Sequence, residues 1–440
     1  MLREDWLGEL TEFLAIPSVS ADAGRADAVR RAADWVAAYV VRLGGVADVL
    51  ADGRLVAGEI AASQAPDAPT VLAYGHYDVQ PPDPLELWES DPFEATVRGD
   101  WLYGRGVADD KGQLWMQLKA AEELVREGRL PVNLRVVCDG EEESAGDEIV
   151  RFLERDERGA DAAVVMDGWM KRWGRPEIVT ATRGIVSADV ELRTGERDLH
   201  SGHYGGTALN AVHALAQALT ALFPREGRLP EELREGVVPP GDDELESWRE
   251  MPAGEEELRR VGAKPLDARA AEEFYLRAWA EPSMDVTAIL GGKPGLRNTT
   301  LVSRASAQVT VRLVPDQDPA RIGAALERLL REAAPTGSEL EVTLAGGPPG
   351  VLARTGPVLD AGLVALERAF GRRPLVVRTG GSLPIVPALA AAGIPTILAG
   401  MATPDSNTHS PNERLLLEAF PTGVRAAREL YLALGALTAF

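Results

Sequence analysis

Apolar residues recur every three or four positions in several segments of the chain, which is the pattern of an amphipathic helix. The first such segment carries Trp6, Leu10 and Phe13. The Ile16-Pro17 pair that follows is expected to end this helix, because a residue before proline is disfavoured in helical geometry. The same spacing predicts further helices over 26–43, 112–127, 356–370 and 413–434.

Between these helices lie short apolar runs rich in β-branched residues, as expected for buried strands. Strands and helices alternate in both outer parts of the chain, which is typical of a sheet with helices packed on its faces. The sequence therefore predicts an α/β fold with a central mixed sheet flanked by helices. The predicted strands cover 70–74, 133–138, 162–166 and 395–399.

The middle of the chain has a different pattern, in which strand-like and helical runs surround a polar stretch at 224–281. We expect a smaller α+β domain, 183–345, inserted into a discontinuous catalytic domain made of 1–182 and 346–440. The runs of this middle part are strands at 184–192 and 307–313 and helices at 209–222 and 319–333.

Length and charge narrow the classes of function. A chain of 440 residues is long for one domain, which agrees with two. Its formal net charge of −22 argues against binding to nucleic acid or to anionic membranes. Cys138 is the single cysteine, so no intrachain disulfide can form. The first twenty residues are too charged for a signal peptide and no long apolar run is present, so we expect a cytoplasmic protein.

Histidines and acidic residues follow the predicted strands where each strand ends. His76 and Asp78 come after the first of these strands, and alternate residues of a strand project to the same side. A carboxylate beside a histidine often fixes the tautomer of a metal-binding imidazole. On its own, however, so short a motif more often belongs to a surface histidine.

Other acidic positions have a structural explanation as well as a chemical one. Asp109 and Asp110 precede a predicted helix, where either could serve as its N-cap. Glu142 and Glu143 belong to an acidic run that could be a solvated loop. Alternatively, one of these glutamates binds a metal ion while its neighbour stays free as a general base. Asp167 follows a further apolar strand.

The combination of these positions is more informative than any one of them. Two imidazoles and three carboxylates lie at strand ends or in loops, where ligands gather in open α/β sheets. If one carboxylate bridges two metal ions, each ion has three protein ligands and an open position, as a catalytic site requires. This donor set suits Zn²⁺ or Mn²⁺. The candidate ligands are His76, Asp109, Glu143, Asp167 and His409, with Asp109 as the bridge.

Motifs that run through nearly the whole chain point to one family. They are Ile16–Ser20, Gly75–Pro81, Tyr103–Gly106, Asp109–Gly112, Glu142–Ser144, Asp198–Gly202, Val311–Pro315, Gly380–Pro384 and His409–Ser410. With these motifs the sequence resembles the aminoacylase, carboxypeptidase and dipeptidase family of co-catalytic metallopeptidases. It is most similar to the carnosinase and cytosolic nonspecific dipeptidase branch. No single motif is specific, but the set is.

The resemblance implies a site with two divalent metal ions per subunit. His76 and Asp167 would bind one ion, and Glu143 and His409 would bind the other. Asp109 would bridge the two ions and be followed by a cis peptide bond. The resemblance thus implies the same five ligands that the positions at the strand ends suggest.

The resemblance also implies roles in catalysis. Asp78 would orient His76, and Glu142 would take a proton from the water between the metal ions and later deliver it to the leaving amine. The inserted domain would serve as a lid and form a homodimer. In this branch His200 would cross the dimer interface and polarise the scissile carbonyl.

Substrate recognition is implied for a further group of residues. Arg312 would bind the substrate carboxylate, since a guanidinium matches two oxygens. The sequence departs from the branch at Thr379, where a glutamate often stands that would pair with a substrate amine, and at Val302, which replaces a proline. The other expected substrate contacts are Thr299, Ser382 and Arg378.

Three functions remain open at this point. The first is a metallopeptidase of the dipeptidase or carboxypeptidase type, which cuts an amide bond next to a free carboxylate. The second is an N-acyl-amino-acid amidohydrolase, which needs no group for an amine and which Thr379 keeps open. The third, more remote, is a non-catalytic binding protein that retains the fold.

Overall fold

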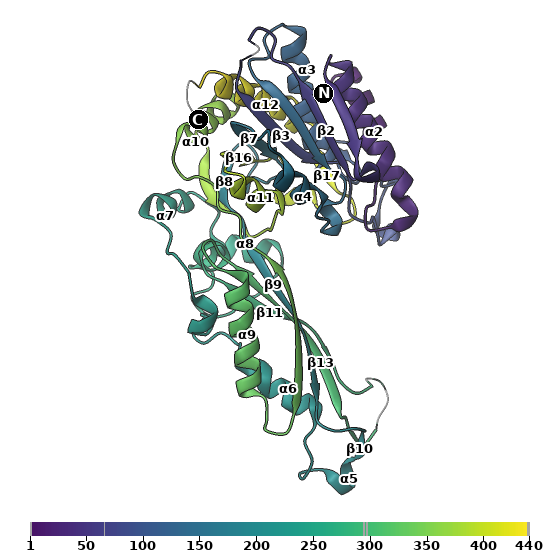
Figure 1. Cartoon of the computed structure of the whole chain (residues 1–440), viewed down its shortest axis with the longest axis vertical. Coiled ribbons are helices and arrows are strands. Elements are labelled where there is room, and N and C mark those ends of the chain that lie inside the picture. Colours follow the sequence, from purple (N-terminus) through teal and green to yellow (C-terminus); the bar gives the residue numbers. More distant parts are fainter. Residues whose placement is uncertain (1, 66, 294, 296–297, 438–440) are drawn as a thin grey trace. The chain divides into compact units, whose positions relative to one another are not determined.

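The computed structural model describes the chain except for residues 1, 66, 294, 296–297 and 438–440. It contains two compact units, which are described separately (Figure 1). The first comprises Met1–Thr180, Leu352–Val377 and Pro384–Phe440, and the second comprises Ala181–Val351 and Arg378–Leu383. The insertion expected at 183–345 lies within the second unit.

The first unit is built on an eight-stranded sheet in the order β1-β2-β6-β3-β7-β16-β8-β15. β3 runs parallel to both β6 and β7, and β16 runs parallel to β7, whereas β1, β2 and β8 join by antiparallel pairing. The predicted mixed sheet is therefore confirmed. The strands are β1 (Val46–Leu50), β2 (Leu55–Ile60), β3 (Thr70–His76), β6 (Asn133–Asp139), β7 (Ala162–Met166), β8 (Glu177–Ala181), β15 (Leu375–Arg378) and β16 (Thr396–Ala399).

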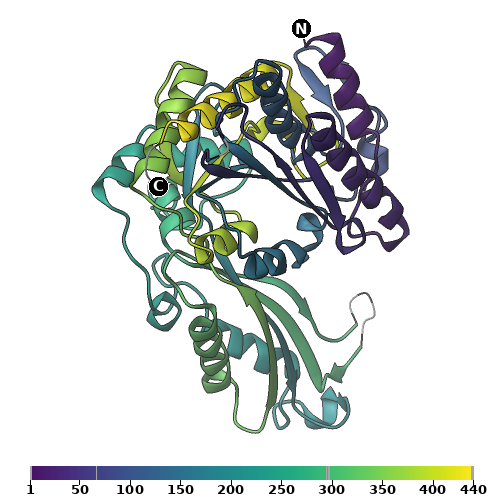
Figure 2. The same cartoon turned by 45° about the horizontal axis from the view of Figure 1, so that its top comes forward.

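The central strands are almost wholly buried because helices cover both faces of the sheet. Every residue of β7 and β16 is buried, as is usual for parallel strands. Figure 2 shows α4 (blue) and α11 (yellow-green) across the sheet from α3 and α12. The helices are α1 (Glu4–Leu14), α2 (Ala26–Arg42), α3 (Lys111–Arg126), α4 (Glu148–Arg155), α10 (Pro357–Phe370), α11 (Ile385–Ala391) and α12 (Ala419–Gly435).

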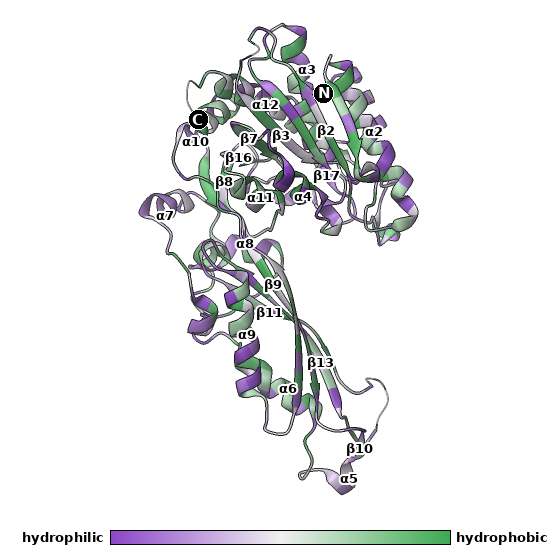
Figure 3. Ribbon diagram, in the orientation of Figure 1, coloured by the Kyte–Doolittle hydropathy of each residue, from purple (hydrophilic) through white to green (hydrophobic). Residues whose placement is uncertain are grey.

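The second unit contains a four-stranded antiparallel sheet in the order β11-β13-β9-β14. Buried residues alternate along β9, and two helices pack against this sheet with their apolar sides. One of them, α9, shows both hydrophobic and hydrophilic residues along its length (Figure 3). The elements are β9 (Gly184–Arg193), β11 (Ser283–Leu290), β13 (Arg304–Leu313), β14 (Glu339–Gly347), α6 (Ala211–Thr220) and α9 (Pro319–Ala333).

Short elements complete both units. The polar stretch of the second unit contains α7 (Asp242–Trp248) and α8 (Gly254–Arg260). The same unit has a small pair of strands, β10 (Leu199–His200) and β12 (Thr300–Leu301), and α5 (Ser201–Tyr204) follows β10 along the chain. The first unit also has a three-stranded sheet of β17 (Arg414–Leu416), β5 (Trp101–Tyr103) and β4 (Thr96–Arg98). Among the described residues, no helix combines the length and the apolar character needed to cross a membrane.

One predicted element begins in the wrong place. The helix expected over 413–434 starts at Ala419, because Arg414–Leu416 pairs with β5 instead. Glu413, which precedes this strand, is fully buried and bound by donors from another loop. Tertiary contacts therefore override the helical pattern at this end.

Candidate metal centre and substrate-binding residues

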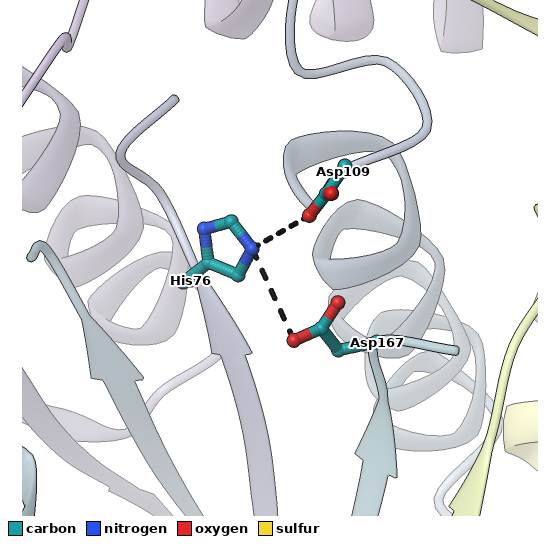
Figure 4. Close-up of side chains that lie close together, drawn as sticks. All are labelled: His76, Asp109 and Asp167. Carbon is teal, nitrogen blue, oxygen red and sulfur yellow. Dashed lines mark hydrogen bonds and ion pairs between the residues drawn. The ribbon is translucent and has the colours of Figure 1, made fainter. Parts of the chain in front are cut away.

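His76 ends β3, and its imidazole faces two carboxylates from other segments. Its Nε2 lies 2.9 Å from Oδ1 of Asp109 and 4.0 Å from Oδ2 of Asp167 (Figure 4). Asp167 directly follows β7, the neighbour of β3 in the sheet, and Asp109 precedes α3. Parallel strands that end at one edge of the sheet thus bring the three side chains together.

Asp109 has a second histidine on its other oxygen. Nε2 of His409 lies 3.0 Å from Oδ2 of Asp109 and 3.1 Å from Oε2 of Glu143. Each oxygen of Asp109 therefore faces a different imidazole, which is the geometry of a carboxylate between two sites. His409 itself has a φ of 61°, a left-handed conformation that side-chain-bearing residues adopt rarely and mostly at functional sites.

The candidate ligands are held by hydrogen bonds from their neighbours. Nδ1 of His76 forms a hydrogen bond with the backbone carbonyl of Asp78 at 3.1 Å and lies 3.3 Å from Oδ1 of the same residue. Oδ2 of Asp78 accepts bonds from Oγ of Ser20 at 2.6 Å and from the backbone N–H of Glu143 at 3.0 Å. One carboxylate thus connects a ligand of each group. Gln80 donates to Oε2 of Glu143 at 2.8 Å and fixes that side chain as well.

Glu413 performs a similar task for the loop that carries Asp109. Its carboxylate accepts backbone N–H bonds from Gly106, Ala108 and Asp109 at 3.0, 2.9 and 3.2 Å, and a bond from the Arg105 guanidinium at 2.7 Å. Glu413 lies four residues after His409, so it connects the two ligand-bearing loops. The peptide bond between Asp109 and Asp110 is cis, as the family resemblance implies.

The charges of this cluster are balanced by shifted protonation. Burial opposes ionisation of Asp109, but hydrogen bonds from His409 and His76 hold its pKa below the usual range. Bonds to Asp109 and Glu143 raise the pKa of His409 to about 10. Burial raises the pKa of Asp167 well above its ordinary value. A divalent cation bound there would favour the ionised form of these carboxylates.

The donors fit divalent metal ions. His76, Asp109 and Asp167 form one group whose ligand atoms all lie within 4.8 Å of one another, and Asp109, Glu143 and His409 form a second. Oδ2 of Asp167 is buried and has no hydrogen-bond partner among the described residues. Imidazole nitrogens and carboxylate oxygens are ordinary ligands of Zn²⁺, and an orphaned buried carboxylate oxygen is expected where a cation belongs.

Glu142 lies beside the cluster without belonging to either ligand group. It begins a short 3₁₀ turn, Glu142–Ser144, and its side chain is partly buried. Burial, followed by the charges of Glu143 and Asp109, raises its pKa to about 7. A carboxylate whose pKa lies near neutral pH is suited to general-base chemistry.

The second unit holds the residues expected to contact the substrate. The exposed His200 accepts a bond at Nδ1 from the backbone N–H of Gly202 at 3.1 Å, so its neutral imidazole carries the proton on Nε2. Arg312, near the end of β13, donates to Oγ of Ser382 at 3.2 Å. Thr299 is exposed and its carbonyl accepts from the N–H of Ser201.

Arg378 is held inside the second unit. Its Nε and Nη2 donate to the two carboxylate oxygens of Glu244 at 2.7 and 2.8 Å, and Trp248 lies under the guanidinium. Only 2% of Arg378 is exposed. Glu244 and Trp248 belong to α7, so these contacts attach α7 to Arg378 within the second unit.

Residue-by-residue reasoning on the sequence missed the supporting positions. Ser20 and Glu413 lie in or beside motifs that carry the family resemblance, but nothing in their local pattern indicates a partner. Ser20 bonds across 58 positions of sequence and Glu413 across more than 300. Only an assembled sheet brings such segments together.

Comparison with known proteins gives the family. The model of "Peptidase family M20/M25/M40" matches residues 72–433, which is most of the chain. The chain belongs to this family. It is therefore a hydrolase acting on peptide bonds, and the predicted relationship is confirmed.

Relatives in the M20 family include named dipeptidases. The cysteinylglycine-S-conjugate dipeptidase of Corynebacterium striatum is 31% identical over 427 residues, which are 93% of this chain and 91% of the relative. The human Beta-Ala-His dipeptidase is 27% identical over 367 residues, covering 80% and 72%. The M20 family metallo-carboxypeptidase Sso-CP2 from Sulfolobus solfataricus has a TM-score of 0.87 at 28% identity, covering 99% of this chain and all of that structure.

Proposed function

We propose that this M20 peptidase is a dinuclear metal-dependent dipeptidase that cleaves the amide bond next to a free carboxylate. One observation carries the proposal. The two oxygens of Asp109 face His76 at 2.9 Å and His409 at 3.0 Å, and a further carboxylate, Asp167 or Glu143, stands beside each histidine. This arrangement provides two adjacent sites that share one bridging carboxylate.

Two divalent ions, Zn²⁺ or Mn²⁺, would be held by His76 and Asp167, by Glu143 and His409, and by Asp109 between them. Bound there, the ions would polarise the scissile carbonyl and lower the pKa of a water. Asp78 keeps His76 oriented, because its backbone carbonyl lies 3.1 Å and its carboxylate 3.3 Å from Nδ1, which leaves Nε2 directed toward the site.

Glu142 is the proposed general base. Its carboxylate takes a proton from the attacking water and returns it to the amine that leaves. The side chain is partly buried, and it needs a free carboxylate for this task while its neighbour Glu143 is committed to His409 and Gln80. The two adjacent glutamates thereby divide ligation and proton transfer between them.

The substrate contacts lie in the second unit. Arg312 binds the carboxylate of the substrate, with Ser382 and Thr299 as further contacts. His200 donates from Nε2 to the oxygen of the scissile carbonyl, as its hydrogen-bonding pattern at Nδ1 favours. Arg378 remains a proposed substrate-binding residue. Because its guanidinium pairs with Glu244, we expect it to support substrate binding indirectly.

Thr379 favours one alternative within the same chemistry. It offers a hydroxyl, bonded at 3.3 Å by the N–H of Gly381, where a glutamate would suit a substrate amine. An N-acyl-amino-acid amidohydrolase needs no such charge. Turnover of L-dipeptides should be compared with that of the matching N-acyl amino acids in the metal-loaded protein. Turnover of the acyl substrates alone would refute the dipeptidase assignment.

A homodimer through the inserted domain, 183–345, is part of the proposal, because His200 would serve the site of a partner subunit. Mixing the inactive variants Glu142→Ala and His200→Ala would then restore some activity, since a mixed dimer has one site with both residues intact. No recovery after subunit exchange would refute the exchange of His200. A cytoplasmic location stays a prediction.

A further inference from the structure

Arg183 is a buried arginine that forms no ion pair with a carboxylate of the described residues. It immediately precedes β9, and only 6% of it is exposed. Its Nη2 donates to the backbone carbonyls of Glu281 at 3.0 Å and Arg312 at 3.2 Å, and to Oγ of Ser283 at 3.1 Å. All three acceptors are neutral. Its Nε is buried and has no hydrogen-bond partner among the described residues.

Among the described residues, Arg183 is the one buried arginine that lacks an ion pair. The three other buried arginines each lie 2.7 Å from a carboxylate: Arg105 from Glu413, Arg135 from Asp156 and Arg378 from Glu244. Burial of a charge is costly unless an opposite charge or a full set of hydrogen bonds compensates it.

A second cation lies next to Arg183. Arg312 pairs across the sheet with Ile185, and among the described residues no carboxylate forms an ion pair with it. Ser382 connects the two arginines, because its Oγ donates to the carbonyl of Arg183 at 2.5 Å and accepts from Nη1 of Arg312 at 3.2 Å. Burial and then the charge of Arg312 lower the pKa of Arg183 to about 10 against the opposing charge of Asp285, so the Arg183 guanidinium remains charged near neutral pH.

A purely structural role does not account for the charge. The bonds of Arg183 connect the start of β9 to β11 and to Glu281, and a neutral donor would serve the same carbonyls. The charge of Asp285 offsets part of the cost of burying Arg183, but among the described residues no carboxylate forms an ion pair with either guanidinium, so the two positive charges repel each other. A bound anion would compensate the buried charge of Arg183 and reduce the repulsion between the two guanidiniums. A carboxylate suits this place because its two oxygens can accept hydrogen bonds from guanidinium N–H groups.

We infer that Arg183 is a specificity-determining residue, which adds a second positive charge behind Arg312 and Ser382 so that the site recognises the free carboxylate of the substrate. This inference rests on the proposed function, because it concerns the same substrate group. Arg183 acts through Arg312: it bonds the backbone carbonyl of Arg312 and strengthens the positive potential at its guanidinium.

The test compares L-alanyl-L-alanine with L-alanyl-L-alaninamide, which lacks the negative charge but keeps the scissile bond. Metal-loaded wild type should prefer the free acid. In Arg183→Gln the KM for the acid should rise on the order of tenfold to a hundredfold, while kcat and the KM for the amide change little, because one charged interaction is lost. The preference for the acid should therefore collapse.

Arg135→Gln is the matched control, since it removes another buried guanidinium from the first unit and should leave the preference unchanged. An equal loss on both substrates in Arg183→Gln, or an unchanged preference, would overturn the inference. If Arg183→Gln does not fold, Arg183→Lys is read in the same way: it retains the charge with a shorter reach, and the KM for the acid alone should rise. Wild type that shows no preference for the acid contradicts the proposed carboxylate recognition itself, and this inference with it.

Discussion

At the scale of single residues, three of the candidate ligands, His76, Glu143 and Asp109, are oriented by a further polar group of the chain. Asp78 supports His76 and the backbone of Glu143, and Gln80 supports the side chain of Glu143. Glu413 holds the backbone of Asp109. Such supporting groups set ligand geometry and metal affinity nearly as much as the ligands themselves.

The proposed general base and a proposed metal ligand can be distinguished by replacing them one at a time. Glu142→Gln should retain both metal ions and lose turnover by a factor on the order of a thousand, because only the proton acceptor is lost. His409→Ala should weaken metal binding, because one ion loses a ligand. Metal content after dialysis and kcat for a dipeptide measure the two effects. Equal loss of metal in both variants would contradict the assignment of Glu142 as the base.

Glu413 gives a second prediction at this scale. In Glu413→Gln the amide nitrogen replaces one of two oxygens that accept backbone N–H bonds, so the Asp109 loop loses its anchor. We expect metal affinity to fall about tenfold to a hundredfold, measured by calorimetric titration of Mn²⁺ into metal-free protein. Glu122→Gln is the control, since Glu122 is an equally buried carboxylate that contacts none of the candidate ligands. Affinity matching that of the control would show that Glu413 supports only the fold.

At the scale of elements, loops at strand ends carry the chemistry, while strands and helices fix where those loops begin. β17 is the clearest case. Its three residues pair with β5 and delay the last helix until Ala419, which leaves the His409 loop beside the loop that carries Asp109. The short helix α7 has a comparable role in the second unit, where Glu244 ties it to Arg378.

The ion pair between Glu244 of α7 and Arg378 can be tested by measuring the stability of the protein. Glu244→Gln leaves the buried Arg378 guanidinium without its counter-charge, so the free energy of unfolding should fall by about 3 kcal/mol or more. Urea unfolding followed by circular dichroism measures the change. Glu332→Gln, which removes an exposed partner of Arg328 on α9, should have little effect. Similar stability of the two variants would mean that the buried pair contributes no more than a surface pair.

At the scale of the whole molecule, the five candidate ligands all belong to the first compact unit, and Arg312, Ser382 and Arg183, which we propose for carboxylate recognition, all belong to the second. Metal binding at the proposed site would therefore be coupled to the stability of the first unit. Each unit has its own hydrophobic core, so we expect the stability of each unit to depend on metal differently.

Removal of metal should lower the melting temperature of the first unit only. A ligand that binds the folded state at a hundred times its Kd stabilises it by about 2.7 kcal/mol, which corresponds to a shift on the order of 5 °C for a unit of this size. Differential scanning calorimetry with and without chelator measures the shift. A melting profile that is the same in both conditions would argue against metal binding in the first unit.

The sequence by itself determined much of this protein. Helical and strand periodicity located α1, α2, α3 and α9 and the central strands, because these elements bury one face or lie wholly inside and their patterns are strong. The acidic residues and histidines at strand ends, together with the motifs, indicated the ligand set and the family. These features depend on local pattern and on residue type, both of which can be read from the amino-acid sequence alone.

Only the tertiary structure decided how those residues are supported. It brought Glu413 to the Asp109 loop, Ser20 to Asp78 and Glu244 to Arg378, and it placed Arg183 beside Arg312 with no ion-pair partner among the described residues. Each of these depends on contacts between segments distant in sequence, where the energy comes from burial and from hydrogen bonds that form only once the strands are ordered. The late start of α12 has the same cause, since the burial of Glu413 and the pairing of β17 outweigh a local helical preference.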